Sequence, residues 1–202
     1  VLFGIALSPQ FIKKVAETPN YVQKLIQYNQ IQDDEFHNLE LYTDCLADEL
    51  ADFLISKGYP AYSQSEANIN SKGYYDKENK STPLPHKTLA LLAGLGWIGK
   101  NNLLITTEYG CALSMCSVLT NAPLPAVSLT PARPKCGDCT ICKETCSPNA
   151  IKGNSWSVST PRDELVDVQK CTTCLECLVC CPWTRAYANS HDSRVPKSRG
   201  RV

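Results

Sequence analysis

The chain has 202 residues, with 20 Lys and Arg against 20 Asp and Glu, so its formal net charge is zero. Neutrality disfavours a protein that holds nucleic acid by bulk electrostatics alone. No apolar run approaches the roughly 18–20 residues that a membrane helix needs. The 12 cysteines are about 6% of the chain, below the roughly 8–10% of short disulfide scaffolds. Nine of them lie between Cys136 and Cys181, and this clustering favours a metal centre over disulfides spread across the fold.

The first residues, 1–7, form a short apolar run that predicts a buried strand. They lack an initiator Met and the basic stretch of a signal peptide, so we expect the native chain to start earlier. Apolar spacing predicts a helix over 9–30 and a clearer helix over 38–57. The apolar stripe of the second helix is Leu39, Leu46, Leu50, Phe53 and Leu54. Cys45 lies on this helix and is expected to be a core thiol.

Further elements follow in the middle of the chain. Residues 59–62 predict a short strand, 64–85 a long polar loop, and 87–93 a helix that ends at Gly94. Strand-like segments come next, at 103–107 and 111–120. Because strands alternate with helices, the sequence indicates an α/β layer.

The composition changes sharply at Cys136, after a linker marked by several prolines. We therefore predict an α/β domain over 1–130 and a small cysteine-rich domain over 131–185. Residues 186–202 predict a mobile basic tail, as a solvated end of the chain rather than a phosphate-binding arm.

Two cysteine arrays carry the strongest chemical signal. Cys136-x2-Cys139-x2-Cys142-x3-Cys146 and Cys171-x2-Cys174-x2-Cys177-x3-Cys181-Pro182 both have the spacing of bacterial [4Fe–4S] ferredoxins. Three closely spaced thiolates take three corners of a cubane, and in two-cluster proteins the fourth cysteine of each array crosses to the other cluster. Cluster I is therefore predicted on Cys136, Cys139, Cys142 and Cys181. Cluster II is predicted on Cys171, Cys174, Cys177 and Cys146.

Zinc is the main alternative to iron–sulfur clusters. A zinc ribbon needs two C-x2-C pairs about 15–20 residues apart, whereas 31 residues lie between Cys139 and Cys171. Disulfides are disfavoured because consecutive C-x2-C steps pair poorly within one loop. Cys180 is a spare thiol expected near a cluster, and Cys111 and Cys116 are expected in the core or in a pocket.

The central part of the chain resembles the epoxyqueuosine reductase family. The resemblance lies in AGLGWIGKN at 93–101, TEYG at 107–110, LTNAPLP at 119–125 and CLVCCPW at 177–183, and it covers roughly residues 80–185. It implies a nitroreductase-like α+β layer that holds a cobalamin beside two [4Fe–4S] clusters. In that family, electrons pass through the clusters to cobalt, which reduces an epoxide on a tRNA base.

The resemblance also implies a set of corrinoid-binding residues, which are Gly96, Trp97, Lys100, Asn101, Leu104 and Met115. The glycines of this turn have two explanations that the residues alone leave open. They let the backbone approach a large flat ring, or they simply connect a helix to a strand.

The sequence departs from the family at the proton donor. An ungapped count places Lys80 where the reductases have an Asp, and His86 stands nearby as a second candidate donor, with a solvated loop histidine as the alternative. The second array also lacks the long insertion found in the family, and the helical-repeat extension after Pro-Trp is missing. We therefore expect a shorter paralogue, for which tRNA is a possible but not a favoured substrate.

Three functions compete at this point. The first is an iron–sulfur oxidoreductase that passes electrons to a bound cobalamin, and the second is a two-cluster electron-transfer protein that serves a corrinoid or other redox partner. The third, a tRNA-binding module with structural clusters, is disfavoured by the neutral charge. We expect an electron donor such as ferredoxin or flavodoxin, no membrane partner, and a reducing cytoplasmic setting.

Overall fold

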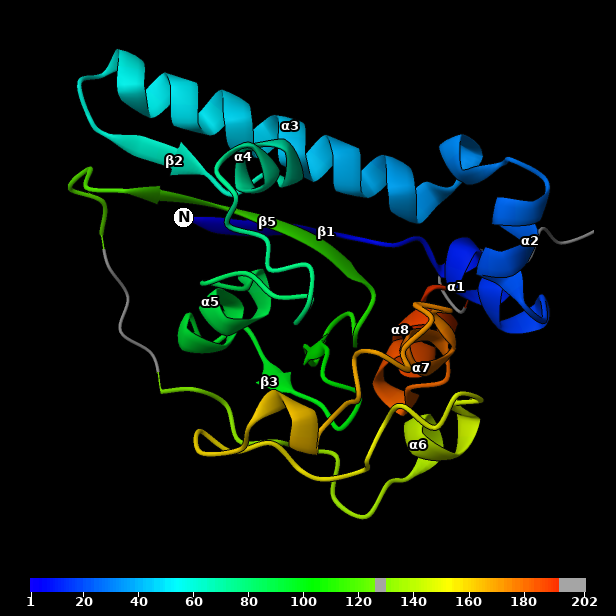
Figure 1. Ribbon diagram of the computed structural model, residues 1–202. Helices are drawn as coiled ribbons and strands as arrows, with labels where there is room; N and C mark the ends of the chain where they lie inside the picture. Colours follow the sequence, from blue (N-terminus) through cyan, green and yellow to red (C-terminus); the bar gives the residue numbers. More distant parts are fainter. Residues whose placement is uncertain (126–129, 193–202) are drawn as a thin grey trace, which may run out of the picture.

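The computed structural model describes residues 1–125 and 130–192 (Figure 1). Its main sheet has three antiparallel strands in the order β1-β5-β2, namely β1 (Leu2–Ala6), β5 (Leu113–Thr120) and β2 (Ala61–Ser63). Gly4 lies opposite Met115, and Tyr62 lies opposite Leu119. A second, two-stranded antiparallel sheet consists of β3 (Trp97–Ile98) and β4 (Leu104–Ile105). The fold is therefore mixed α and β, with antiparallel pairing in both of these sheets.

The long helix α3 (Glu35–Ser56) covers one face of the main sheet (Figure 1). The carboxylate of Asp34 accepts hydrogen bonds from the first backbone N–H groups of this helix, which fixes where it begins. The helix packs on β5 through residues at three- and four-residue spacing, whose buried members are Thr43, Ala47, Ala51 and Leu54. The small side chains of Thr43, Ala47 and Ala51 allow the helix to approach the sheet closely.

Two side chains of this helix that the sequence predicted in the hydrophobic core, those of Phe53 and Cys45, are exposed instead. Phe53 is 56% exposed. The prediction that Cys45 is a core thiol is wrong, because Cys45 is exposed and contacts Glu49 one turn further along the helix. The buried face runs through Thr43 and Ala47, and Cys45 lies two residues from each, which places it on another side of the helix.

The helix predicted over 9–30 is divided in two. Helix α1 (Pro9–Glu17) is capped by the Ser8 hydroxyl, and α2 (Tyr21–Gln27) follows after a break. Thr18 is extended, as expected for a residue that precedes a proline, and Asn20 has a left-handed φ of 55°. A 3-10 turn (Ile31–Asp33) then leads into α3.

The polar stretch predicted as one loop over 64–85 contains a short helix. In helix α4 (Glu66–Ser71), Ile69 is the buried residue. A single buried position gives no repeating apolar pattern from which the helix could be predicted. A turn joined by a bridge between Asp76 and Ser81 follows, and α5 (His86–Leu92) then begins close to the predicted position. The cysteine-rich segment contains α6 (Ile141–Thr145), a 3-10 turn (Arg162–Glu164) and α7 (Glu176–Val179).

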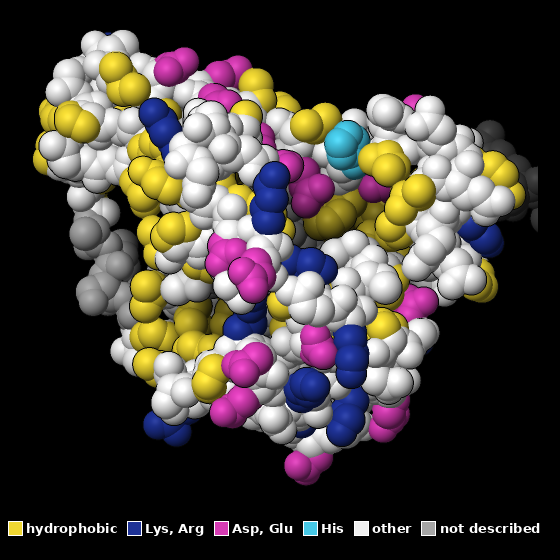
Figure 2. All heavy atoms as spheres, in the orientation of Figure 1, with side chains coloured by type: hydrophobic (Ala, Val, Ile, Leu, Met, Phe, Trp, Pro, Cys, Tyr) yellow, Lys and Arg dark blue, Asp and Glu magenta, His cyan; other side chains and the backbone are white. Residues whose placement is uncertain are grey.

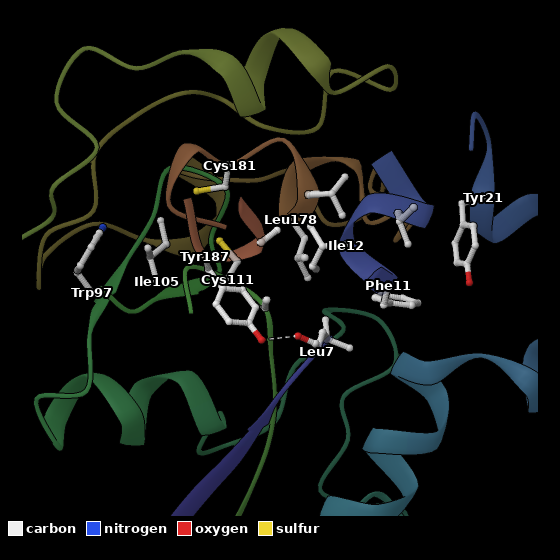
Figure 3. Close-up of a cluster of buried hydrophobic side chains, with 14 residues drawn as sticks. Leu7, Phe11, Ile12, Tyr21, Trp97, Ile105, Cys111, Leu178, Cys181 and Tyr187 are labelled. Atoms are coloured by element: carbon white, nitrogen blue, oxygen red, sulfur yellow. Dashed lines mark hydrogen bonds between the residues drawn. The ribbon is translucent and has the colours of Figure 1, made fainter. Parts of the chain in front are cut away.

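The last described element, α8 (Pro182–Asp192), corrects the tail predicted over 186–202. The chain is helical up to Asp192, and Tyr187 and Ala188 are buried. The Tyr187 hydroxyl donates a hydrogen bond to the Leu7 carbonyl at 2.9 Å (Figure 3). Residues 193–202, which include the rest of that tail, lie outside the described residues, as does the linker segment 126–129.

The main hydrophobic core joins the two predicted domains. Leu7, Phe11 and Ile12 from the start of the chain pack in one buried group with Leu178 and Tyr187 from its cysteine-rich part (Figure 3). A boundary near residue 130 therefore does not separate two hydrophobic cores. Within residues 1–125 and 130–192, the helices are all too short or too polar to cross a bilayer.

Candidate metal centre

The first three cysteines of the first array and the last cysteine of the second array line one cavity of about 330 Å³. Its cysteines are Cys136, Cys139, Cys142 and Cys181. Three of them come from the turn and helix at the start of the array, where the Cys139 N–H donates to the Cys136 carbonyl at 3.1 Å. Cys181 arrives from the other end of the cysteine-rich segment, directly before α8. This is the set that the sequence assigned to cluster I.

The last cysteine of the first array lies instead with the second array. Cys146 is buried in a small hydrophobic group against which Cys171 and Cys177 pack, as does Cys142 of the first array. Cys174 lies within electrostatic range of Cys146, whose charge helps to raise the pKa of the Cys174 thiol after the larger effect of burial. The four residues assigned to cluster II are thus neighbours across a long stretch of sequence.

Burial shifts the pKa of some of these thiols upward. It raises the pKa of Cys142 to about 11, with smaller contributions from neighbouring cysteines, and it raises the pKa of Cys177 well above the ordinary range. Cys181 differs, because the hydrogen bond from Cys111 lowers its pKa to about 6, against burial and helped by the Trp183 and Thr184 backbone N–H groups. A thiolate at a helix N-terminus is stabilised in this way.

None of the twelve cysteines forms a disulfide in the structure. Among residues 1–125 and 130–192, no three His, Cys, Asp or Glu side chains stand close enough together to hold a single metal ion. In a cubane, by contrast, each thiolate binds a different iron atom, and the ligands surround the whole cluster.

The predicted glycines are explained by the packing of the protein itself. A Cβ atom on Gly96 would lie 2.1 Å from the Ile105 carbonyl oxygen, and one on Gly99 would lie 2.4 Å from the Ile105 side chain. Trp97, predicted at the corrinoid face, is 1% exposed and packs edge-on against Trp183 with ring centroids 5.0 Å apart. Gly96, Trp97 and Gly99 therefore serve the packing around β3 and β4.

Lys100 and Asn101, two more of the predicted corrinoid-binding residues, both line the cysteine cavity. The Lys100 ammonium donates to the Cys139 carbonyl at 3.2 Å. The Asn101 carboxamide donates to the Cys177 carbonyl at 3.2 Å and to the Cys111 sulfur at 3.4 Å. These two residues belong to the surroundings of the two cysteine groups.

Leu104 and Met115 line a separate cavity of about 300 Å³, beside Gly4 and Tyr109. Neighbouring residues of a strand point to opposite faces, and on β4 this places Ile105 at the cysteine cavity and Leu104 at the other one. The six residues predicted to bind cobalamin are therefore divided by β4.

The largest cavity, of about 890 Å³, is enclosed by α3, α4 and β5, and Leu113 and Met115 line both it and the Leu104 cavity. Figure 2 shows a hollow on this side of the molecule, with acidic side chains at its edge and hydrophobic side chains in its floor. Its acidic residues, which the sequence gave no motif to identify, are Glu40, Asp44 and Glu66. Burial, with the charges of Glu66 and Asp44, raises the pKa of Glu40 to about 7.

The two candidate proton donors are in different places. His86 lines the largest cavity, where its Nδ1 atom lies 2.9 Å from the Ser117 hydroxyl and burial lowers its pKa. Lys80 is exposed, and its ammonium donates to the Val168 carbonyl at 2.9 Å. Arg162 donates to the Lys80 carbonyl at 2.9 Å, so this turn is held against the cysteine-rich segment.

The spare thiol, Cys180, lines a groove between α1, α7 and α8. Cys116 is fully buried beneath α3, and Cys111 is buried next to Cys181. The expectation of a core or pocket position is confirmed for Cys111 and Cys116.

No protein-family model matches this chain. It is similar to curated epoxyqueuosine reductases: that of Synechococcus sp. (strain RCC307) is 38% identical over 122 residues, which cover 54% of this chain and 38% of the relative. The relative from Aliivibrio fischeri is 30% identical over 52% of this chain and 32% of its own length, and that from Synechocystis sp. is 30% identical over 64% and 48%. The matches thus span between about a third and a half of these relatives.

Solved structures show the same likeness in the fold. A crystal structure of epoxyqueuosine reductase with an epoxyqueuosine-modified tRNA-Tyr stem loop has a TM-score of 0.51 and 22% identity over 72% of this chain and 40% of that one. The epoxyqueuosine reductase from Bacillus subtilis has a TM-score of 0.50 and 23% identity over 72% and 39%. The resemblance read from the sequence, to an epoxyqueuosine reductase-like family, is confirmed.

Proposed function

We propose that this chain is an iron–sulfur oxidoreductase that relays electrons through two [4Fe–4S] clusters to a reductive reaction similar to epoxyqueuosine reduction. One observation carries the proposal: three cysteines of the first array and the last cysteine of the second line a single cavity of about 330 Å³. Spacing along the chain supplies the first three, and only the fold brings Cys181 to them.

The chain's own residues would hold cluster I on Cys136, Cys139, Cys142 and Cys181, and cluster II on Cys171, Cys174, Cys177 and Cys146. Each thiol must lose its proton to bind iron. Cys181 is prepared for this by the hydrogen bonds that lower its pKa, whereas burial leaves Cys142 and Cys177 protonated until iron displaces the proton. Because each array would supply ligands to both clusters, the crossed arrangement would bring the two centres close together, which suits electron relay.

The second half of the proposal is a bound cobalamin, which would lie in the hollow that Leu104 and Met115 line beside β5. Leu104 and Met115 would contact the corrinoid there, and the adjoining largest cavity would take the substrate. Bound cobalamin supplies a low-valent cobalt that can reduce a substrate by two electrons. His86, held by Ser117 at the wall of the same cavity, is better placed than Lys80 to hold and move a proton.

A two-cluster electron-transfer protein is the second candidate function. The observation that favours it is the division of the predicted corrinoid residues, since Gly96 and Trp97 serve packing while Lys100 and Asn101 line the cysteine cavity. Such a protein would pass electrons to a corrinoid enzyme or another redox partner.

The partners follow from the same chemistry. A low-potential carrier such as ferredoxin or flavodoxin would supply electrons, in a reducing compartment such as the cytoplasm. One structure with the same fold contains a modified tRNA stem loop, which makes tRNA a candidate substrate. The zero net charge requires that tRNA be held by specific contacts and not by bulk attraction.

Anaerobic metal analysis and cobalamin titration test the proposal together. The reconstituted chain should contain about eight irons, four for each cluster. Addition of cob(II)alamin should change its visible and paramagnetic spectra, and Met115→Trp, which fills the hollow, should abolish that change while leaving the iron content intact. Zinc in place of iron would contradict the whole proposal. Full iron content without any response to cobalamin would leave the electron-transfer protein.

A further inference from the structure

Lys100 is a buried cation that the two-cluster assignment does not use. It is 9% exposed, and it lines the cavity that Cys136, Cys139, Cys142 and Cys181 share. Its ammonium donates a hydrogen bond to the Cys139 carbonyl at 3.2 Å, which fixes the charge beside the loop of the first array. Lysine is almost never buried to this extent unless its charge is paired.

The protein itself gives this charge no carboxylate partner. Within residues 1–125 and 130–192, no Asp or Glu forms a salt bridge with Lys100. Among the described residues that line the cavity, none is acidic, and Lys135 adds a second positive charge. The Cys139 carbonyl that accepts from Lys100 is neutral, so it satisfies one N–H donor without compensating the charge. Because a buried charge is costly unless it is paired, the cavity favours an anionic occupant.

We propose that Lys100 compensates the negative charge of cluster I and thereby raises the reduction potential of that cluster. The inference rests on the proposed function, because it requires a cluster on the four cysteines of this cavity. A cubane bound by four thiolates is an anion, and reduction adds one more negative charge to it. A fixed cation beside the cluster therefore stabilises the reduced form more than the oxidised form. Net charge is among the features that set the potential of an iron–sulfur cluster.

Lys100 should act mainly on cluster I. The cavity that it lines and the carbonyl to which it donates belong to cysteines of that cluster, whereas the four cysteines assigned to cluster II do not line this cavity. The Coulomb interaction falls with distance, so the nearer cluster should gain more. A higher potential at cluster I would favour electron transfer from cluster II to cluster I.

Lys135 provides an internal comparison, because it lines the same cavity but is exposed. Its ammonium lies 5.3 Å from the centroid of the Trp97 ring. Water and salt screen an exposed charge more than a buried one. Lys135 should therefore raise the potential of cluster I less than Lys100 does, and its effect should diminish as the salt concentration rises.

The test is a redox titration of the anaerobically reconstituted full chain, followed by electron paramagnetic resonance. The signal that Cys139→Ala loses identifies cluster I. Lys100→Met removes the charge and keeps an unbranched side chain, and we expect it to lower the midpoint potential of cluster I at both low and high salt while that of cluster II stays unchanged. Lys100→Arg keeps the charge and should retain most of the wild-type potential. Lys135→Met is the matched control and should lower the potential of cluster I less.

The outcomes distinguish this inference from the proposed function. Wild-type protein without about eight irons contradicts the proposed function and the inference with it. Full iron content with an unchanged cluster I potential in Lys100→Met, or an equal shift in Lys135→Met, overturns only the role of Lys100. Lys100→Gln keeps an N–H donor for the Cys139 carbonyl without the charge, so it should repeat the shift of Lys100→Met. If both neutral variants lose irons that Lys135→Met retains, Lys100 serves the folding of the loop, and the tuning role is wrong.

Discussion

The two sides of β4 hold cavities of different character. On the Ile105 side, four cysteines and three polar residues, Lys100, Asn101 and Lys135, line a cavity of about 330 Å³. On the Leu104 side, a cavity of about 300 Å³ is lined by apolar residues and by Thr106, Thr107 and Glu108, and it shares Leu113 and Met115 with the cavity of about 890 Å³ that has an acidic edge. One strand of two residues separates the cavity that the cysteines line from the cavity in which we propose that a corrinoid binds.

The largest effect should come from disrupting the close contact between Gly96 and Ile105 on β4, the strand between the two cavities. A Cβ on Gly96 would meet the Ile105 carbonyl, which is backbone and cannot move aside. We expect Gly96→Ala to lower the free energy of unfolding by about 3 kcal/mol or more, measured by urea denaturation. Gly73→Ala is the control: its φ of +67° strains an alanine by about 1–2 kcal/mol, but nothing lies within 4 Å of the new Cβ. Equal losses in the two variants would contradict the packing role of Gly96.

The next effect concerns the cysteine side alone. Cys177→Ala should lower the iron content from about eight to about four per chain, because cluster II loses a ligand. Cys180→Ala, three residues further on, removes a thiol that the assignment leaves spare and should retain about eight. An iron content of eight in Cys177→Ala would refute its role as a ligand.

A smaller effect should come from the contact between α8, which follows the cysteine-rich segment, and the start of the chain. Tyr187→Phe removes the buried hydrogen bond to the Leu7 carbonyl and should cost about 1 kcal/mol in the free energy of unfolding. The matched control is Tyr62→Phe, because the buried Tyr62 hydroxyl has no hydrogen-bond partner within the described residues. Equal free energies of unfolding in the two variants would contradict a stabilising role for the hydrogen bond between Tyr187 and Leu7.

The smallest effect should appear at the acidic edge of the largest cavity. Because the pKa of Glu40 is raised to about 7 from 4.5, the folded state prefers its protonated form. The resulting stability is complete below the unfolded pKa near 4.5 and is lost as the pH rises through about 7. Wild-type protein should therefore lose more stability between pH 4.5 and pH 8 than Glu40→Gln does. A charge-neutralising control on the outer part of the same helix, Glu49→Gln, should follow wild type, and identical pH profiles for all three proteins would contradict the interpretation.

The sequence predicted the cysteine side of the molecule better than the other side, for a physical reason. Cysteines at every third position must share one tight turn, so the arrays could be identified from local spacing. Their crossing followed from the ferredoxin pattern, and the structure brings Cys146 next to Cys171 and Cys177. The resemblance of the chain to a known family was also confirmed by the relatives.

The β5 side depends on contacts between distant segments. Glu40 and Glu66 reach one cavity from different helices, and no spacing in the sequence links them. The glycines at 96 and 99 could serve a cofactor or a backbone contact, and only the position of Ile105 distinguishes these uses. Cys45 was misplaced for a similar reason: Thr43, Ala47 and Ala51, and not the larger apolar residues, form the face that packs on β5.

The crossed ligation of the two clusters is tested most directly by the paramagnetic spectrum of Cys146→Ala. Cys146 belongs to the first array in sequence but lies with the second array in space. We predict that Cys146→Ala loses the same signal as Cys177→Ala and keeps the signal that Cys139→Ala loses. If Cys146→Ala instead matches Cys139→Ala, each array binds its own cluster, and the crossed two-cluster arrangement is wrong.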